Sequence, residues 1–138
     1  MKIGFVGLGK LGLPCAEEMT RQHEVIGYDT EHRVSSHVTV TQDIEQVFKD
    51  TEIIFVAVPT PHHPDYDGSK PTTHLPVRDF DYSLVKAVLQ QCQKYANKNQ
   101  IVALISTVLP GTTRREFARY TQNFQFVYNP YLIAMGSE

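Results

Sequence analysis

The stretch KIGFVGLGKLGLPCAEEM, residues 2–19, decides the fold. It begins with the apolar run KIGFVG and carries glycines at positions 7, 9 and 12. Apolar residues then recur at helical spacing, so the order predicts a strand, a glycine turn and a helix. A second apolar run, HEVIGYD at 23–29, is typical of a strand buried on both faces of a parallel sheet. One strand-helix-strand unit is therefore expected to end at residue 29.

The rest of the chain continues this alternation. Four more strands are predicted at HVTV (37–40), EIIFVAV (52–58), QIVALIS (100–106) and FQFVY (124–128). A helix through Ile44, Val47 and Phe48 is expected to start from an N-cap at Thr41, with Glu45 close to capping-box spacing.

Two further helices complete the pattern. Asp81 is expected to cap a helix whose buried face comprises Leu84, Val85, Val88, Leu89 and Cys92. Another helix follows Pro110 and Gly111. Six strands alternating with helices predict an α/β fold of the Rossmann type. We expect a doubly wound, mainly parallel six-stranded sheet with helices on both faces and the strand 52–58 near its centre.

The composition limits the classes of protein. With 138 residues, of which 41% are hydrophobic and 20% charged, the chain suits a single globular domain over 1–138. Thirteen basic and fifteen acidic residues give a net charge of -2, which argues against nucleic acid as a partner. The longest apolar runs are far shorter than the roughly 18 residues of a membrane span. The N-terminus lacks the pattern of a signal peptide, so the cytoplasm is the expected location.

The glycines form the motif Gly7-Leu8-Gly9-Lys10-Leu11-Gly12, a GxGxxG sequence between a strand and a helix. The first glycine permits a tight turn, the second lets a pyrophosphate approach the backbone, and the third lets helix and strand pack closely. The helix N-terminus then favours an anion. This motif predicts a dinucleotide-binding site made by Gly7, Gly9, Lys10, Leu11 and Gly12.

Asp29 supports that interpretation, because it ends the second strand 22 residues after Gly7. A carboxylate there can accept hydrogen bonds from an adenosine ribose and repels a 2'-phosphate. NAD is therefore the expected cofactor, although Arg33 nearby leaves NADP open. Two alternatives compete for the glycines. They could serve packing alone, or GFVGLGK could begin a phosphate-binding loop, but Leu11 stands where that loop needs Ser or Thr.

Three later motifs resemble one family. VAVPTP (56–61), STVLPGTTR (106–114) and Asn129-Pro130 followed by Gly136 are similar to the NAD-binding domain of UDP-glucose/GDP-mannose dehydrogenases. The resemblance covers nearly the whole chain. Members of the family oxidise the C6 alcohol of a nucleotide sugar in two NAD-linked steps, through a thiohemiacetal on a cysteine. It implies that Val58, Pro59 and Thr60 lie near the cofactor, and Thr107 near the nicotinamide and the reacting carbon. Each threonine has a plainer alternative as the cap of a turn.

The sequence departs from the family in three places. Tyr131 and Met135 stand where the family has glutamates, and a phenol with a pKa near 10 is a poor base at neutral pH. The segment 30–40 is shorter than usual. The chain stops at Glu138, before the family's second domain, and neither Cys15 nor Cys92 sits in the family's cysteine context. Both cysteines are expected to be buried. We therefore expect this polypeptide alone not to turn over a sugar nucleotide.

The segment 59–79 is rich in proline and is expected to form a long ordered loop or lid. Lys70 and Arg78 are its candidate phosphate contacts. Its potential metal ligands are His62, His63, Asp65, Asp67 and His74. Adjacent histidines in an extended segment do not easily face one metal, so no metal site is predicted.

Two other functions remain open at this point. The chain could be a cofactor-binding or assembly module without catalysis, or a relative of the β-hydroxyacid dehydrogenases, whose glycine loop is similar. A nucleotide sugar is an expected partner only where a second domain is supplied. A homodimer is expected, since apolar surface would be exposed without such a domain.

Overall fold

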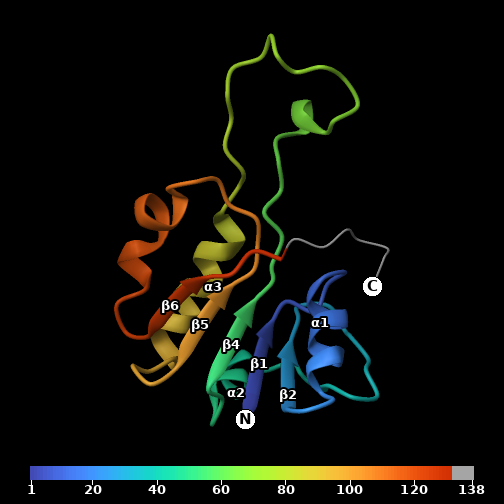
Figure 1. Cartoon of the computed structure of the whole chain (residues 1–138), viewed down its shortest axis with the longest axis vertical. Helices are drawn as coiled ribbons and strands as arrows, with labels where there is room; N and C mark the ends of the chain where they lie inside the picture. The colour runs from blue at the N-terminus through green and yellow to red at the C-terminus, as the bar shows by residue number, and fades with distance from the viewer. Residues whose placement is uncertain (132–138) are drawn as a thin grey trace.

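The predicted sheet is present in the computed structural model, which describes residues 1–131. Six strands lie in the order β3-β2-β1-β4-β5-β6, and every neighbouring pair is parallel. They are β1 (Lys2–Val6), β2 (Glu24–Tyr28), β3 (Thr39–Thr41), β4 (Ile53–Val56), β5 (Ile101–Leu104) and β6 (Gln125–Tyr128). β4 lies between β1 and β5, as expected for the most apolar run (Figure 1). The Rossmann-type architecture is confirmed.

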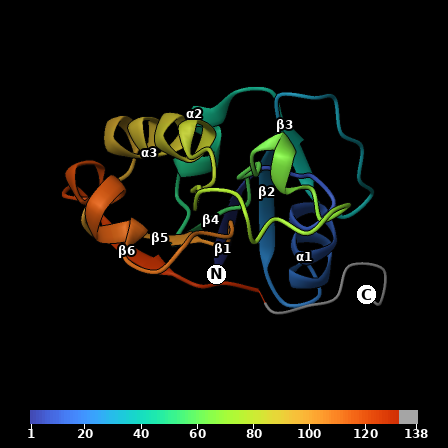
Figure 2. The ribbon, with the colours of Figure 1, turned by 90° about the horizontal axis from the view of Figure 1, so that it is seen from above.

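Helical elements cover both faces of the sheet (Figure 2). The helix α1 (Gly12–Met19) packs on one face, and α2 (Ile44–Phe48) and α3 (Ser83–Tyr95) pack on the other. The helix expected after Gly111 is a wide π-type turn, η2 (Thr113–Phe117), which continues into a 3-10 turn, η3 (Ala118–Tyr120). A further short turn, η1 (Pro64–Tyr66), lies in the long loop.

Two hydrophobic cores result, one on each face. Under α1, Ile3, Phe5 and Leu8 are buried, and the ring of Phe5 stacks on Phe55 at 5.1 Å between centroids. Under α2, α3 and η2, the fully buried side chains include Val56 and Phe117. Burial of such side chains stabilises a fold by about 1.5–3 kcal/mol each, so the two cores fix the sheet and hence its carboxyl edge.

Three local expectations need correction. The N-cap of α2 is Asp43, whose carboxylate accepts a hydrogen bond from the Glu45 N–H at 3.1 Å. Thr41 instead ends β3, and its hydroxyl oxygen accepts from the Asp43 N–H at 3.0 Å. At α3 the cap position is Tyr82, although the Asp81 carboxylate does accept from the Ser83 N–H at 2.8 Å.

The third correction concerns side chains expected in the core. Leu84 is 47% exposed, whereas Val85, Leu89 and Cys92 are buried. Cys15 is only partly buried and packs against the core under α1. Burial raises the pKa of the Cys92 thiol to about 12, so that thiol is protonated at neutral pH.

The loop between β4 and α3 projects beyond the carboxyl edge of the sheet, in green and yellow in Figure 1. Its two ends are joined, since the Asp81 N–H donates to the Pro61 carbonyl at 2.9 Å. At its far end the hydroxyl of Tyr66 donates to the carbonyl of Pro76. Within residues 1–131, no helix is long and apolar enough to cross a membrane.

Candidate dinucleotide site

The glycine turn has a different spatial reason for each glycine. Gly7 has a φ of +98°, and a Cβ there would lie 2.6 Å from the carbonyl oxygen of Ala57. At Gly12 a Cβ would lie 2.0 Å from the carbonyl oxygen of Gly7, so only glycine lets α1 start against the turn. A Cβ at Gly9 would meet nothing within 4 Å. The turn therefore leaves open space at the one glycine expected to face a ligand.

That space belongs to an open pocket of about 910 Å³ at the carboxyl edge of the sheet. Its walls come from the ends of β1, β2, β4 and β5 and from α3. The structure brings nearly all the predicted site residues to it: Gly7, Gly9, Lys10, Leu11, Asp29, Val58, Pro59, Thr60 and Thr107. Gly12 is buried beneath the turn and does not line it. Ligands of open α/β sheets bind in such a position.

Asp29 is held in place by the backbone. One carboxylate oxygen accepts the Leu8 N–H at 2.7 Å, and the other accepts the Glu31 N–H at 2.9 Å. The first bond ties the end of β2 to the glycine turn. Because each carboxylate oxygen has about two acceptor positions, Asp29 retains capacity for the hydroxyls of a ribose.

Hydroxyl groups tie the ends of β4 and β5 together at the same edge. The Thr60 hydroxyl donates to the Thr107 carbonyl at 2.8 Å, and the Ser106 hydroxyl donates to the Val58 carbonyl at 2.7 Å. The Thr60 hydroxyl thus joins two separate loops and does not cap the turn next to it, which was its plainer alternative. Thr107 is exposed, and its side chain lines the pocket without a hydrogen bond to any described residue.

One wall of the pocket was missed from the sequence. Leu84, Ala87, Val88 and Gln91 line it from α3. Their spacing of three and four residues forms a second stripe beside the core stripe. The sequence already indicated this second stripe, because one core-facing stripe does not account for both of the adjacent apolar residues Leu84 and Val85. Ser106 and Glu31 were also missed, and both line the pocket.

Tyr131 and Met135 stand at the positions where the family has glutamates. Tyr131 lines the pocket and is partly buried. Burial, and to a lesser degree the nearby thiol of Cys15, raise the pKa of the Tyr131 phenol, so it is neutral near pH 7. Met135, like Gly136, lies outside the described residues.

The long loop takes no part in the pocket beyond its first residues. Lys70 and Arg78 are exposed and do not line it. Over residues 1–131, no group of His, Cys, Asp and Glu side chains could hold a metal ion. His63 contacts Asp65 at 3.4 Å and the ring of Tyr66 within the loop itself.

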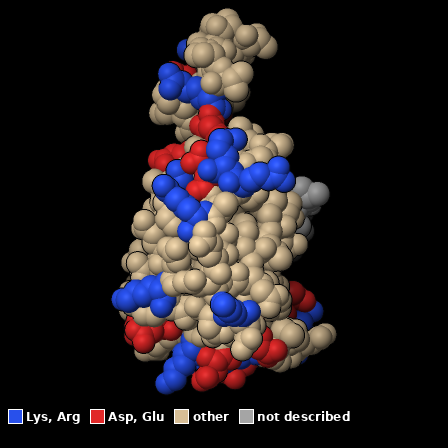
Figure 3. Space-filling model, turned by 90° about the vertical axis from the view of Figure 1, so that its left-hand side faces the viewer, with Lys and Arg blue, Asp and Glu red and all other residues tan. Residues whose placement is uncertain are grey.

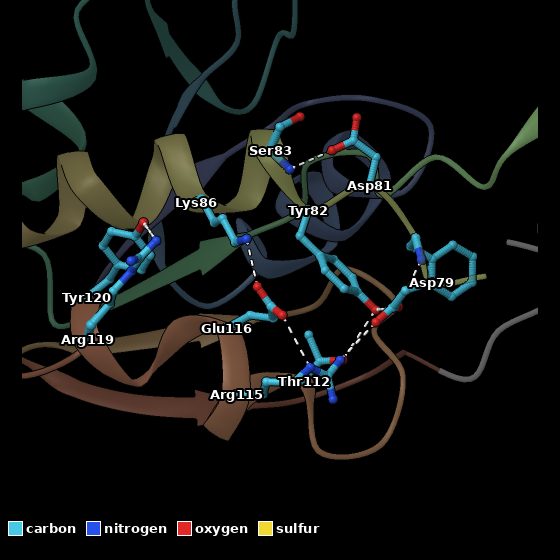
Figure 4. Close-up of polar contacts among 11 residues, drawn as sticks. Asp79, Asp81, Tyr82, Ser83, Lys86, Thr112, Arg115, Glu116, Arg119 and Tyr120 are labelled. Atoms are coloured by element: carbon cyan, nitrogen blue, oxygen red, sulfur yellow. Dashed lines mark hydrogen bonds and ion pairs between the residues drawn. The ribbon is translucent and has the colours of Figure 1, made fainter. Parts of the chain in front are cut away.

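A polar network joins the base of this loop to η2 (Figure 4). The buried hydroxyl of Tyr82 donates to the Asp79 carboxylate and accepts from the Leu109 N–H at 3.1 Å. Arg115 donates to the other Asp79 oxygen at 2.8 Å. Lys86 on α3 contacts Glu116 at 2.7 Å. The network holds the segment after Thr107 against α3, the helix that forms one wall of the pocket.

The parallel sheet, the glycine turn and the pocket at the carboxyl edge define a Rossmann-type dinucleotide-binding domain. The family model described as "UDP-glucose/GDP-mannose dehydrogenase family, NAD binding domain" matches residues 30–138. The chain therefore belongs to the UDP-glucose/GDP-mannose dehydrogenase family, as its NAD-binding domain. NAD as the cofactor of this domain is confirmed. The glycine turn precedes the matched range.

Individual relatives agree with this assignment. The chain is 27% identical to a UDP-N-acetyl-D-glucosamine 6-dehydrogenase of Salmonella typhi, over 100% of this chain and 36% of that protein. It is 31% identical to Protein CapL of Staphylococcus aureus, over 83% of this chain and 28% of that one. The fold matches a GDP-mannose dehydrogenase of Pseudomonas aeruginosa with a TM-score of 0.76 and 21% identity, over 98% of this chain and 37% of that one. The chain thus spans between 28% and 37% of the length of these relatives.

Proposed function

We propose that residues 1–138 form one NAD-binding domain that serves a nucleotide-sugar 6-dehydrogenase, in which a hydride passes from the sugar C6 to NAD. The observation that carries this proposal is the pocket that joins the open space at Gly9 to the carboxylate of Asp29. NAD supplies the hydride acceptor when bound. In the proposal, the glycine turn and Lys10 receive the pyrophosphate, and Asp29 receives the adenosine ribose.

The carboxyl ends of β4 and β5 have the second role in this proposal. Val58, Pro59 and Thr60 flank the nicotinamide side, where the Thr60 bond to Thr107 holds the two loops together. Thr107 is the candidate catalytic residue, because its exposed hydroxyl has no partner among residues 1–131 that would withdraw it from the pocket. It would orient a water molecule or the reacting oxygen.

In this proposal, the covalent step is carried out by residues other than those that line the pocket. The family's chemistry needs a thiolate, and neither cysteine lines the pocket. Cys92 is also buried and protonated. A nucleotide sugar would therefore bind productively only with a second domain. The location proposed for the protein is the cytoplasm, where NAD is available.

A homodimer is part of the same proposal. Among residues 1–131, β6 is an edge strand on which Val127 and Tyr128 are 43% and 38% exposed, and an edge with apolar side chains favours contact with another chain. Sedimentation of the purified chain tests this part separately. A monomer at micromolar concentration would contradict it.

Calorimetric titration with NAD tests the central proposal. We expect one NAD per chain, and a loss of at least tenfold in affinity for Asp29→Ala, because the ribose acceptor is removed. Asp29→Ala also frees the Leu8 N–H, so Asp29→Asn, which keeps one acceptor, is the matched variant and should lose less. Binding of neither NAD nor NADP by the folded wild-type chain would refute the proposal.

A non-catalytic cofactor-binding module is the second candidate function. It is favoured by Tyr131, a neutral phenol in the place where the family has a glutamate. The two candidates differ in one measurement, the formation of NADH from UDP-sugars after the second domain of a relative is supplied. Tight NAD binding without any reduction would favour the module.

A further inference from the structure

Three charged side chains lie together on the rim of the pocket, just after β2. They are Asp29, Glu31 and Arg33, and all three line it. Arg33 contacts Glu31 at 2.6 Å through one terminal nitrogen, and its Nε lies 3.7 Å from the Asp29 carboxylate. That Nε is buried without a hydrogen-bond partner. The guanidinium is therefore held by the outer carboxylate while part of its donor capacity is unused.

The two kinds of charge suit different dinucleotides. A carboxylate at the end of the second strand accepts the ribose 2'-hydroxyl of NAD, whereas an arginine nearby accommodates the 2'-phosphate of NADP. This chain has both within five positions. The choice between NAD and NADP then depends on whether the Arg33 guanidinium is free to donate to a phosphate. The N–H groups that pair with a protein carboxylate cannot pair with a phosphate at the same time.

We propose that Glu31 strengthens the preference of the pocket for NAD by holding Arg33 in an ion pair, and that removal of Glu31 makes Arg33 available to a 2'-phosphate. This inference rests on the proposed function. The inference concerns Glu31 and Arg33 and not Asp29, which is unchanged in every variant below. Asp29 continues to disfavour the 2'-phosphate, so Glu31 changes the degree of preference.

The exposure of the pair makes the exchange feasible. The side chain of Glu31 is 72% exposed and that of Arg33 is 33% exposed. Ion pairs in such positions add little to stability, so a phosphate can replace the glutamate without loss of the fold. The remaining cation on the pocket wall, Lys10, belongs to the glycine turn and is unchanged.

The experiment measures the ratio of the dissociation constants for NADP and NAD by calorimetry at one ionic strength. We expect this ratio to fall about tenfold in Glu31→Gln, as one additional charged contact would produce. In the double variant Glu31→Gln with Arg33→Ala the ratio should return to the wild-type value. The control is Glu18→Gln, which breaks the exposed pair (3.0 Å) between Glu18 on α1 and Arg21 just after it, away from the pocket, and should leave the ratio unchanged.

Each result decides between specific ideas. An unchanged ratio in Glu31→Gln, with NAD still bound by the wild type, overturns the role of Glu31 alone. An equal fall in the double variant also overturns it, because the effect would then be the loss of one negative charge. Wild-type affinity for NADP equal to that for NAD would refute the preference itself. If the wild type binds neither dinucleotide, the proposed function and this inference both fail.

Discussion

The second and third glycines of the turn are expected to separate binding from stability. Gly9→Ala adds a methyl group where nothing lies within 4 Å, so stability should change by less than about 1 kcal/mol while NAD affinity falls at least tenfold. Gly12→Ala places a Cβ 2.0 Å from the Gly7 carbonyl and should destabilise by several kcal/mol. Thermal unfolding and NAD titration measure the two effects. Equal losses of stability would contradict the assignment of Gly9 to the ligand.

The hydroxyl of Tyr82 is the second single group with a definite expected cost. In Tyr82→Phe the partly buried Leu109 N–H loses its acceptor and the Asp79 carboxylate loses a donor, so we expect a loss of about 1–3 kcal/mol in the free energy of unfolding. Tyr95→Phe is the matched control, since among residues 1–131 its hydroxyl accepts only from the exposed Lys94, and should cost less than about 0.5 kcal/mol. Urea unfolding of the two variants compares them directly. Similar midpoints would show that the buried network adds no stability.

At the residue scale the sequence predicted positions better than contacts. Asp29 was predicted at the end of a strand opposite the glycines, because strand length and glycine spacing are local features. Its bonds to Leu8 and Glu31 depend on how two strands meet, and no local pattern encodes them. Gln100 is a similar case. Its buried amide donates to the carbonyls of Phe48 and Thr51, which lie about fifty positions earlier in the chain.

Among the elements, α3 has two functional faces, and a pair of leucines distinguishes them. Leu89 is fully buried, so Leu89→Ala should cost about 2–5 kcal/mol in stability. Leu84 is 47% exposed and lines the pocket, so Leu84→Ala should cost less than about 1 kcal/mol and weaken NAD binding severalfold. Chemical unfolding and titration of both variants check this. A large loss of stability for Leu84→Ala would instead support the single buried face, including Leu84, that was expected from the sequence.

The contact between α3 and η2 gives stability a defined pH dependence. Glu116 accepts one hydrogen bond from Lys86 and one from Arg115, and these two bonds lower the pKa of Glu116 below its ordinary value of 4.5. Arg115 also contacts Asp79. A lowered folded-state pKa means that the contribution is fully present above pH 4.5 and is lost as the pH falls through that pKa. The Tm difference between wild type and Glu116→Gln should therefore shrink below pH 4.5. A difference that stays constant down to pH 3 would be the contrary result.

Element types were predictable because buried parallel strands read as unbroken apolar runs and helices as runs with a period near 3.6. Element ends were not. Thr41 and Asp43 are both good capping residues, and only the end of β3 at Thr41 leaves Asp43 to cap α2. The wide turn η2 also has no sequence signature distinct from that of an α-helix.

At the scale of the whole molecule, the charges on one face can be followed directly in Figure 3. On the face that carries α3 and η2, basic and acidic side chains are interspersed, and much of the surface is uncharged (Figure 3). No basic field extends over this face, in agreement with the net charge of -2. The features that define function are instead concentrated at the carboxyl edge of the sheet, from which the long loop projects.

That loop is expected to be independent of both the fold and the cofactor pocket. Residues 62–78 include none that are fully buried and none that line the pocket, and the bond between Asp81 and Pro61 closes the base. Replacing 63–77 by Gly-Ser-Gly should leave the Tm within about 3 °C, because a shorter loop costs slightly less closure entropy. NAD affinity should remain within about twofold by titration. Arg115→Ala is the control, since it keeps the loop length but removes the contact to Asp79, and should lower the Tm. Loss of NAD binding in the shortened chain would instead show that the loop closes over the cofactor, as a lid does.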